Sequence, residues 1–87
     1  MHQIQHDKEM ELLKRCLRGS SESFSVIVGH YQFLVCGIAF ALTGNLGKSE
    51  ELAQETFIQA WKNLRQLQDL SKFKPWLCQI ARNVVQN

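Results

Sequence analysis

Apolar residues recur every three or four positions along most of this chain, which is the spacing of one face of an α-helix. The longest such stripe lies in the first half of the chain and consists of Phe24, Ile27, Val28, Tyr31, Leu34, Val35, Ile38, Ala39 and Leu42. No segment alternates polar and apolar residues as a β-strand does. The pattern therefore predicts an all-α fold.

The first two helical segments begin and end at residues that favour helix ends. Asp7 is placed to cap a first helix, and Gly19 is placed to end it. Ser21 or Ser23 can open a second helix, which the Thr-Gly-Asn run at residues 43–45 ends. Two helices joined by a short turn around Gly19 are therefore expected.

Two further helices follow, separated by a polar connector at residues 65–70. The third is expected to start between residues 45 and 49 and to run to about Leu64. Its inward positions are Leu52, Ala53, Phe57, Ala60, Trp61 and Leu64. Ser71 is a suitable cap for the fourth helix, with Pro75 in its first turn. The inward positions of this helix are Trp76, Leu77, Ile80, Ala81 and Val84. We expect one domain over residues 1–87, folded as a compact bundle of four helices.

Composition excludes several classes of protein. The chain has 87 residues, and 45% of them are hydrophobic, which is too many for a disordered tail. The longest apolar run, residues 33–42, is too short to span a membrane. No basic segment precedes an apolar one near the N-terminus, so no secretory signal is visible. Cys16, Cys36 and Cys78 then indicate reduced core thiols in a cytoplasmic protein.

Charge is unevenly distributed along the chain. Residues 1–60 hold five Lys/Arg and seven Asp/Glu, whereas residues 61–87 hold five Lys/Arg and one acid. A basic C-terminal third suggests a polyanionic partner, and the acidic part before it suggests a different one.

Candidate catalytic and metal-binding residues are sparse. The only closely spaced ligand pair, His2 and His6, lies close to the N-terminus, so we expect no metal site and no cofactor. No glycine-rich phosphate loop is present. A nucleophilic pair of Cys78 and His30 stays open as an alternative, in which Cys78 would be reactive. The sequence otherwise gives no basis for an enzyme.

Two outward surfaces remain as candidate binding sites. On the third helix, Glu51, Glu55, Ile58 and Lys62 are spaced four, three and four residues apart, so they share a face. An apolar residue among acids suits a basic helical partner. An ordinary solvated helix face would have the same pattern.

The second surface combines the connector with the outer face of the fourth helix. Lys72, Lys74 and Arg82 can neutralise phosphates. Base edges can be read by the amides of Gln79, Asn83 and Gln86. In the connector, polar side chains lie beside apolar ones, a mixture that can hold an unstacked base. A solvated face again remains the alternative.

Two segments of the sequence carry motifs that are more distinctive than the helical pattern. Residues 49–61 read SEELAQETFIQAW, and residues 73–83 read FKPWLCQIARN. Together they closely resemble region 2 of bacterial sigma factors of the extracytoplasmic-function (ECF) group. The upstream positions that also fit are Leu12, Leu13, Gly19, Ser20, Phe24 and Tyr31.

The resemblance implies a role in transcription initiation. Members of this family are dissociable promoter-specificity subunits of RNA polymerase. Their region 2 domain binds the coiled coil of the largest polymerase subunit, then reads and helps open the −10 promoter element on the nontemplate strand. Anti-sigma factors sequester them, so such a partner is also implied.

The same resemblance assigns roles residue by residue. The core-docking motif falls on Glu51, Gln54 and Glu55, with Ile58 beside it. A pocket for an everted base would be lined by Asn63, Leu67, Ile80 and Asn83. The full set of implied DNA-binding residues is Asn63, Leu67, Gln68, Asp69, Ser71, Lys72, Lys74, Gln79, Ile80, Arg82, Asn83 and Gln86. Phe73 and Trp76 would be core residues.

The chain departs from the family pattern in two ways. Many relatives have an aromatic residue at the Leu67 position followed by a Gly-Asp-Ser-like loop, where this chain reads Leu-Gln-Asp-Leu-Ser. The departure leaves open which base the pocket accepts. Relatives also have a second helical domain that reads the −35 element. The chain ends at Asn87, so we expect it to be one domain of a longer protein. The alternative is a protein that lacks half of its promoter reader. As an alternative function, the chain would be a helical interaction module that has kept this fold and lost promoter binding.

Overall fold

Helices make up nearly all of residues 5–87, the part of the chain that the computed structural model describes. They are α1 (His6–Leu17), α2 (Ser21–Thr43), α3 (Leu46–Asn63) and α4 (Phe73–Gln86). Two 3-10 turns, η1 (Leu64–Gln66) and η2 (Leu70–Lys72), join α3 to α4. No strand occurs among the described residues. The predicted all-α, four-helix fold is confirmed.

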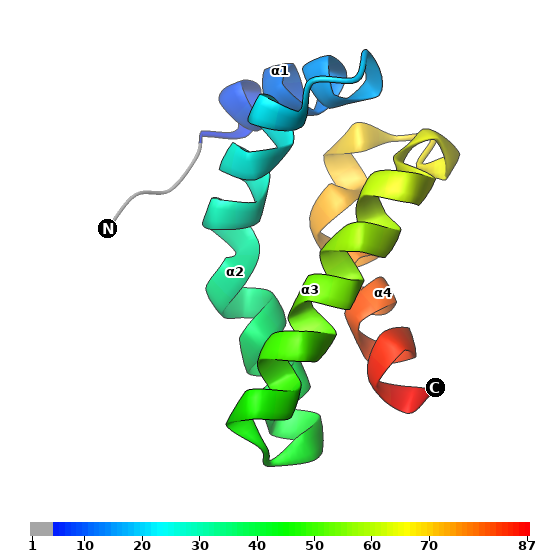
Figure 1. Ribbon diagram of the computed structural model, residues 1–87. Coiled ribbons are helices and arrows are strands. Elements are labelled where there is room, and N and C mark those ends of the chain that lie inside the picture. Colours follow the sequence, from blue (N-terminus) through cyan, green and yellow to red (C-terminus); the bar gives the residue numbers. More distant parts are fainter. Residues whose placement is uncertain (1–4) are drawn as a thin grey trace.

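Three helices lie side by side, and the fourth lies across one end. Figure 1 shows α2, α3 and α4 packed together, with α1 across the end where α2 begins and where α3 leads into the connector. Because α1 also contacts η2, the N-terminal helix touches the connector as well as α2.

The core collects the apolar stripes of all four helices. Fully buried side chains come from α1 (Leu13), α2 (Ile27, Val35), η1 (Leu64) and α4 (Phe73, Leu77). The predicted stripe of α2 is buried or half-buried along most of its length, but Leu42 is 54% exposed. The two tryptophans are not part of the sealed core: Trp76 is half-buried and Trp61 is exposed.

Glycines end the first two helices as predicted. Gly19 and Gly44 have φ angles of 97° and 67°, a left-handed conformation that residues with a Cβ rarely adopt. The Gly44 amide donates to the Phe40 carbonyl oxygen at 2.8 Å and so closes α2.

The predicted N-terminal caps are only partly correct. Asp7 does not cap α1, which begins one residue earlier at His6, so Asp7 lies in the first turn instead. The cap of α2 is Ser20, whose hydroxyl oxygen accepts from the Ser23 amide at 3.2 Å. In α3 the cap is Asn45, inside the predicted interval, and its Oδ1 accepts from the Lys48 amide at 2.9 Å.

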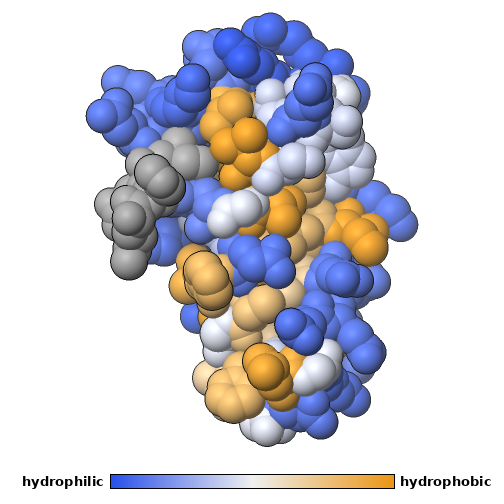
Figure 2. Space-filling model, turned by 60° about the vertical axis from the view of Figure 1, so that its left-hand side comes forward, coloured by the Kyte–Doolittle hydropathy of each residue, from blue (hydrophilic) through white to orange (hydrophobic). Residues whose placement is uncertain are grey.

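α2 is longer than its apolar run suggests. The helix spans 23 residues and is the one described helix that is long and apolar enough to cross a membrane by length and composition alone. A core helix of a soluble protein meets the same criterion, and α2 buries Ile27, Tyr31 and Val35 against the other helices. Its opposite face is exposed, and Figure 2 shows apolar side chains along the side of the molecule on which α2 lies.

Candidate functional site

The outward face of α3 carries all four predicted docking residues. Glu51, Gln54 and Glu55 are exposed, and Ile58 is 48% exposed. The opposite face of the same helix is buried through Ala53 and Ala60, which fixes the orientation of the helix. Glu55 accepts a hydrogen bond from Gln59 Nε2 at 3.2 Å. The structure therefore presents an acidic surface with one apolar residue, which we call the acidic α3 face (Glu51, Gln54, Glu55 and Ile58).

An apolar cavity adjoins this face. It has a volume of about 300 Å³ and is lined by Phe24 of α2 and by Phe57, Ile58 and Trp61 of α3. The rings of Phe24 and Trp61 pack with their centroids 5.0 Å apart and tilted by 54°. Trp61 was expected to face inward, but it is 37% exposed because it lies at the edge of the α2–α3 contact. Neither Phe24 nor Trp61 was predicted as a site residue. For Trp61, the one available signal in the sequence is its position three residues after Ile58, which places the two side chains near each other on α3.

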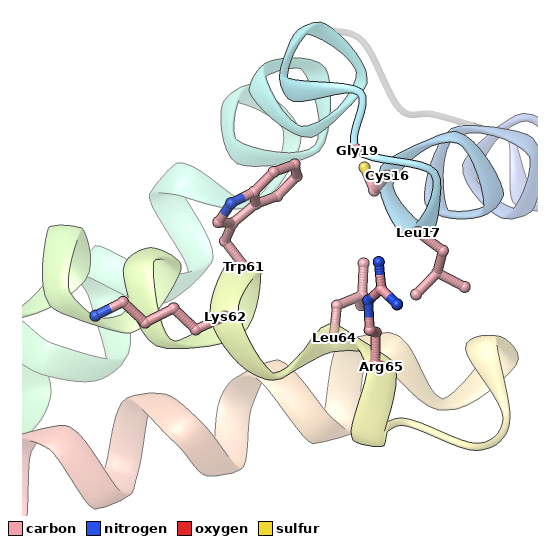
Figure 3. A pocket seen from close by; sticks show the side chains of 7 residues that line it. All are labelled: Cys16, Leu17, Gly19, Trp61, Lys62, Leu64 and Arg65. Atoms are coloured by element: carbon pink, nitrogen blue, oxygen red, sulfur yellow. The ribbon is translucent and has the colours of Figure 1, made fainter.

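Trp61 also borders a second cavity, at the junction of α1 and α3. This cavity of about 290 Å³ is lined by Cys16, Leu17, Gly19, Trp61, Lys62, Leu64 and Arg65. In Figure 3 the Arg65 guanidinium lies on the side of the cavity near Leu17, whereas Lys62 extends away from it. Burial raises the pKa of the Cys16 thiol, so this thiol stays protonated at neutral pH and is a poor nucleophile.

The connector is ordered by a local hydrogen-bonded turn. Asp69 Oδ1 accepts from the Ser71 amide at 3.0 Å and from the Ser71 hydroxyl at 2.6 Å. These two bonds, helped by the charge of Lys72, lower the pKa of the Asp69 carboxyl. The prediction that Ser71 caps the last helix is wrong: Asp69 caps η2, and α4 follows it directly. Leu67 and Leu70 pack against the core and anchor the connector on both sides.

The four residues predicted to line a base pocket lie on adjoining elements. Asn63 ends α3, Leu67 lies in the connector, and Ile80 and Asn83 lie one turn apart on α4, which packs against α3. Leu67 and Ile80 are half-buried against the same core.

Both amides of this set are already hydrogen-bonded. Asn63 Nδ2 donates to the Gln59 carbonyl oxygen at 3.0 Å, and its Oδ1 accepts from Gln66 at 3.4 Å. Asn83 Oδ1 accepts from Gln79 Nε2 at 3.0 Å. Reading a base edge with these side chains therefore requires an exchange of hydrogen bonds.

The outer face of α4 is exposed and basic. The exposed members of the predicted DNA-binding set on and near this helix are Lys72, Lys74, Gln79, Arg82, Asn83 and Gln86; Gln68, Asp69 and Ser71 of the connector are also exposed. α4 contains no acidic residue, and its opposite face is buried through Phe73, Leu77 and Ala81. We call the connector and this helix face together the basic surface.

A third cavity, of about 440 Å³, lies between α1, α2 and the start of α4. It is lined by His6, Glu9, His30, Tyr31, Ser71, Lys74 and Pro75. Glu9 is buried there and accepts a hydrogen bond from the Tyr31 hydroxyl at 2.5 Å. Burial, followed by the bond to Glu9 and its charge, raises the pKa of the Tyr31 phenol. Since Ser71 and Lys74 border this cavity, the pair lies beneath the basic surface.

The described residues contain no group of three His, Cys, Asp or Glu side chains that could hold a metal ion. One member of the predicted His2–His6 pair, His2, lies outside them. Cys78 and His30 are both half-buried, and His30 packs edge-on against the Tyr31 ring at 4.7 Å between centroids.

Comparison with known proteins assigns the family. The profile of the Sigma-70 region 2 family matches residues 27–87, most of the chain. The chain belongs to the Sigma-70 region 2 family. The match begins within α2, so it includes the whole acidic α3 face and the whole basic surface. The predicted resemblance to the region 2 domain of an ECF sigma factor is confirmed.

Individual relatives agree with this assignment. The chain is 39% identical over 75 residues to a probable RNA polymerase sigma factor, RfaY, of Xanthomonas campestris, a match that covers 86% of this chain and 19% of the relative. It is 29% identical to the RNA polymerase sigma-H factor of Pseudomonas aeruginosa, over 97% of this chain and 44% of the relative. It is 32% identical to the ECF sigma factor SigW of Bacillus subtilis, over 83% of this chain and 38% of the relative. The Sigma-70 region 2 chain thus spans less than half of the length of these relatives.

Proposed function

We propose that this domain docks on bacterial RNA polymerase through the acidic α3 face and recognises the nontemplate strand of the −10 promoter element through the basic surface. One observation carries the proposal. In a domain of the Sigma-70 region 2 family, both candidate surfaces are solvent-exposed, while the opposite faces of the same helices form the core. The two surfaces also differ in charge, as two different partners require.

The chemistry of the acidic α3 face fits the coiled coil of the largest polymerase subunit. Glu51 and Glu55 offer carboxylates one helical turn apart to basic residues of a partner helix. Ile58 and the apolar cavity beside it offer a site for one aliphatic side chain. A basic, amphipathic partner helix would satisfy both features.

The chemistry of the basic surface fits a single strand. Its cations can contact phosphates, and its amides and half-buried Leu67 and Ile80 can contact an unstacked base. Unstacking a base costs a few kcal/mol, which these contacts must repay. The proposed role is therefore capture of an opening strand, with no catalytic step and no cofactor.

The proposed partners follow from the same role. They are core RNA polymerase, −10 promoter DNA and an anti-sigma factor that covers these surfaces, and the place of action is the cytoplasm. The competing function is a helical interaction module without promoter binding. Because both functions include protein partners, only binding to DNA separates them.

A reciprocal pair of variants tests the proposal. We expect Glu55→Arg to weaken binding to the isolated clamp coiled coil of RNA polymerase at least tenfold, because it places like charges in contact. Glu11→Arg is the matched control, since Glu11 is an exposed acid on α1. Asn83→Ala should leave docking intact and reduce base discrimination at one position, measured by selecting randomised single-stranded DNA with the polymerase-bound domain.

The outcomes separate the two assignments. Docking that survives Glu55→Arg, or that Glu11→Arg weakens equally, would remove the role of the acidic α3 face. Docking without any sequence preference in the selected DNA would establish the interaction module instead. Loss of both activities in Asn83→Ala would indicate damage to the fold, which circular dichroism would reveal.

A further inference from the structure

α2 has an apolar stripe on the side that faces away from the core. The stripe consists of Val26, Gly29, Phe33, Gly37 and Phe40, and we call it the outer α2 stripe. Phe33 is 89% exposed, Val26 is 50% exposed and Phe40 is 48% exposed. Figure 2 shows apolar side chains at the surface on this side of the molecule. A phenylalanine that is almost fully exposed in the middle of a long helix, with further apolar residues one and two turns away, forms an exposed apolar patch of the kind that is often functional.

The two glycines of the stripe have no close neighbour among residues 5–87 at the position of a Cβ. A Cβ atom added to Gly29 or Gly37 would meet nothing within 4 Å, and neither residue has a positive φ angle. Glycine is among the poorest helix formers, so both positions weaken α2. Glycine on a helix surface permits close approach of another backbone. Because none of the described residues, 5–87, lies within 4 Å of a Cβ at either position, this face leaves room for another backbone.

The spacing of the stripe is symmetric about Phe33. The glycines lie four residues before and after it, and Val26 and Phe40 lie seven residues before and after it. If a second α2 runs antiparallel with a two-fold axis at Phe33, Gly29 faces Gly37 of the other copy and Val26 faces Phe40. Phe33 then meets Phe33 of the other copy, and Val26 meets Phe40. The glycines between these pairs let the two backbones approach each other. Such a stripe is complementary to itself, which an isologous dimer requires.

Charge is compatible with a second copy as the occupant and disfavours charged partners. No Asp, Glu, Lys or Arg occurs between Glu22 and Lys48. Two copies of the stripe therefore meet without repulsion between like charges. A charged partner would find no counter-charge, and an anionic membrane would find no cation along the helix. We propose that the outer α2 stripe pairs with the same stripe of a second copy of this chain.

The size of the stripe sets the strength expected of this pairing. With about 200 Å² for an aromatic side chain, its three large residues expose roughly 300–400 Å² per copy. Two copies would bury roughly 600–800 Å², below the ~1,200 Å² at which specific stable interfaces begin. We therefore expect reversible self-association at roughly 100 μM rather than a permanent dimer. Since Glu55 and Asn83 lie on other helices, failure of this proposal and failure of the proposed function are separable.

Sedimentation of the 87-residue chain between about 10 μM and 1 mM, under reducing conditions, tests the pairing. We expect dimers to appear in the upper part of this range, and Phe33→Glu to weaken association at least tenfold because it places two carboxylates at the two-fold axis. Leu46→Glu is the matched control: Leu46 is 65% exposed on α3, outside the stripe, so its association should equal that of the wild type.

Gly29→Leu distinguishes pairing from a general folding effect. The new side chain meets open space in the monomer and improves helix propensity, so the melting temperature at low concentration should rise by about 3–6 °C. The same side chain blocks backbone approach, so association should weaken at least tenfold.

A chain that stays monomeric to about 1 mM overturns the proposal. Association that survives both stripe variants overturns it as well. Phe33-dependent binding to neutral phosphatidylcholine vesicles by a monomer would replace it with a membrane surface.

Discussion

At the scale of the residue, the Tyr31–Glu9 pair ties α1 to α2 beneath the connector. The Tyr31 phenol has a pKa raised above its ordinary value of 10.0, chiefly by burial. A raised pKa means that the folded state holds this proton more tightly than the unfolded state does. The resulting contribution to stability is complete below pH 10 and is lost as the pH rises above it, by about 1.4 kcal/mol per pH unit.

Tyr31 is the only tyrosine in the chain, so this prediction has a direct measurement. Absorbance at the phenolate band should show no Tyr31 ionisation near pH 10 while the chain stays folded. We expect Tyr31→Phe to cost about 1–3 kcal/mol at pH 7, because buried Glu9 loses its donor. In urea unfolding from pH 9 to 11, this variant should lose stability less steeply than the wild type. Equal slopes would contradict the assignment.

At the scale of the element, the start of α3 depends on one side chain. Asn45 accepts the Lys48 amide hydrogen and follows Gly44, whose left-handed conformation turns the chain from α2 into α3. Removing an N-cap costs about 1 kcal/mol, which lowers the melting temperature of a domain of this size by about 4–8 °C. We expect this result for Asn45→Ala in thermal unfolding followed by circular dichroism. Asn45→Asp keeps an acceptor oxygen and should melt within about 2 °C of the wild type; an equal loss in both variants would assign the effect to another cause.

At the scale of the whole molecule, the connector and α4 present exposed cations, whereas exposed Glu51 and Glu55 lie on α3. Five of the ten cations lie in residues 61–87, and Lys72 and Lys74 are exposed on the basic surface. Each phosphate contact on a single strand contributes about 0.7 to the slope of log K against log salt concentration. Lys74→Ala should therefore weaken DNA binding by the polymerase-bound domain and reduce this slope by about 0.7. Lys14→Ala, which removes an exposed cation on α1, should leave the slope unchanged; an equal change would indicate a diffuse attraction in place of a defined surface.

The ends of the helices were predicted from the sequence with different success at glycine ends and at N-terminal caps. Gly19 and Gly44 were predictable because few residues other than glycine tolerate a left-handed backbone. The predicted caps of α2, Ser21 or Ser23, lie one and three residues after the observed cap, and Ser71, predicted to cap the fourth helix, lies one residue before the N-cap position of α4. Ser20 and Ser21 offer equivalent hydroxyls, and Ser71 donates its amide and hydroxyl to Asp69 instead of acting as a cap itself. Only the observed backbone path decides between such neighbours.

The amino-acid sequence by itself determined the four helices, most of their core-facing positions and the outward position of the acidic α3 face and the basic surface; Leu42 and Trp61 were expected inside and are exposed. Periodicity and helix breakers are local properties, and they survive whatever the helices pack against. Tertiary structure alone decided which of the other apolar and charged residues are buried and which are exposed. Phe24 and Phe33 lie on the same helix, yet α3 crosses over Phe24 and leaves Phe33 exposed. Glu9 is buried because Tyr31 meets it from α2, 22 positions away in the sequence. Burial depends on which helix covers a residue, and the period of a helix does not contain that information.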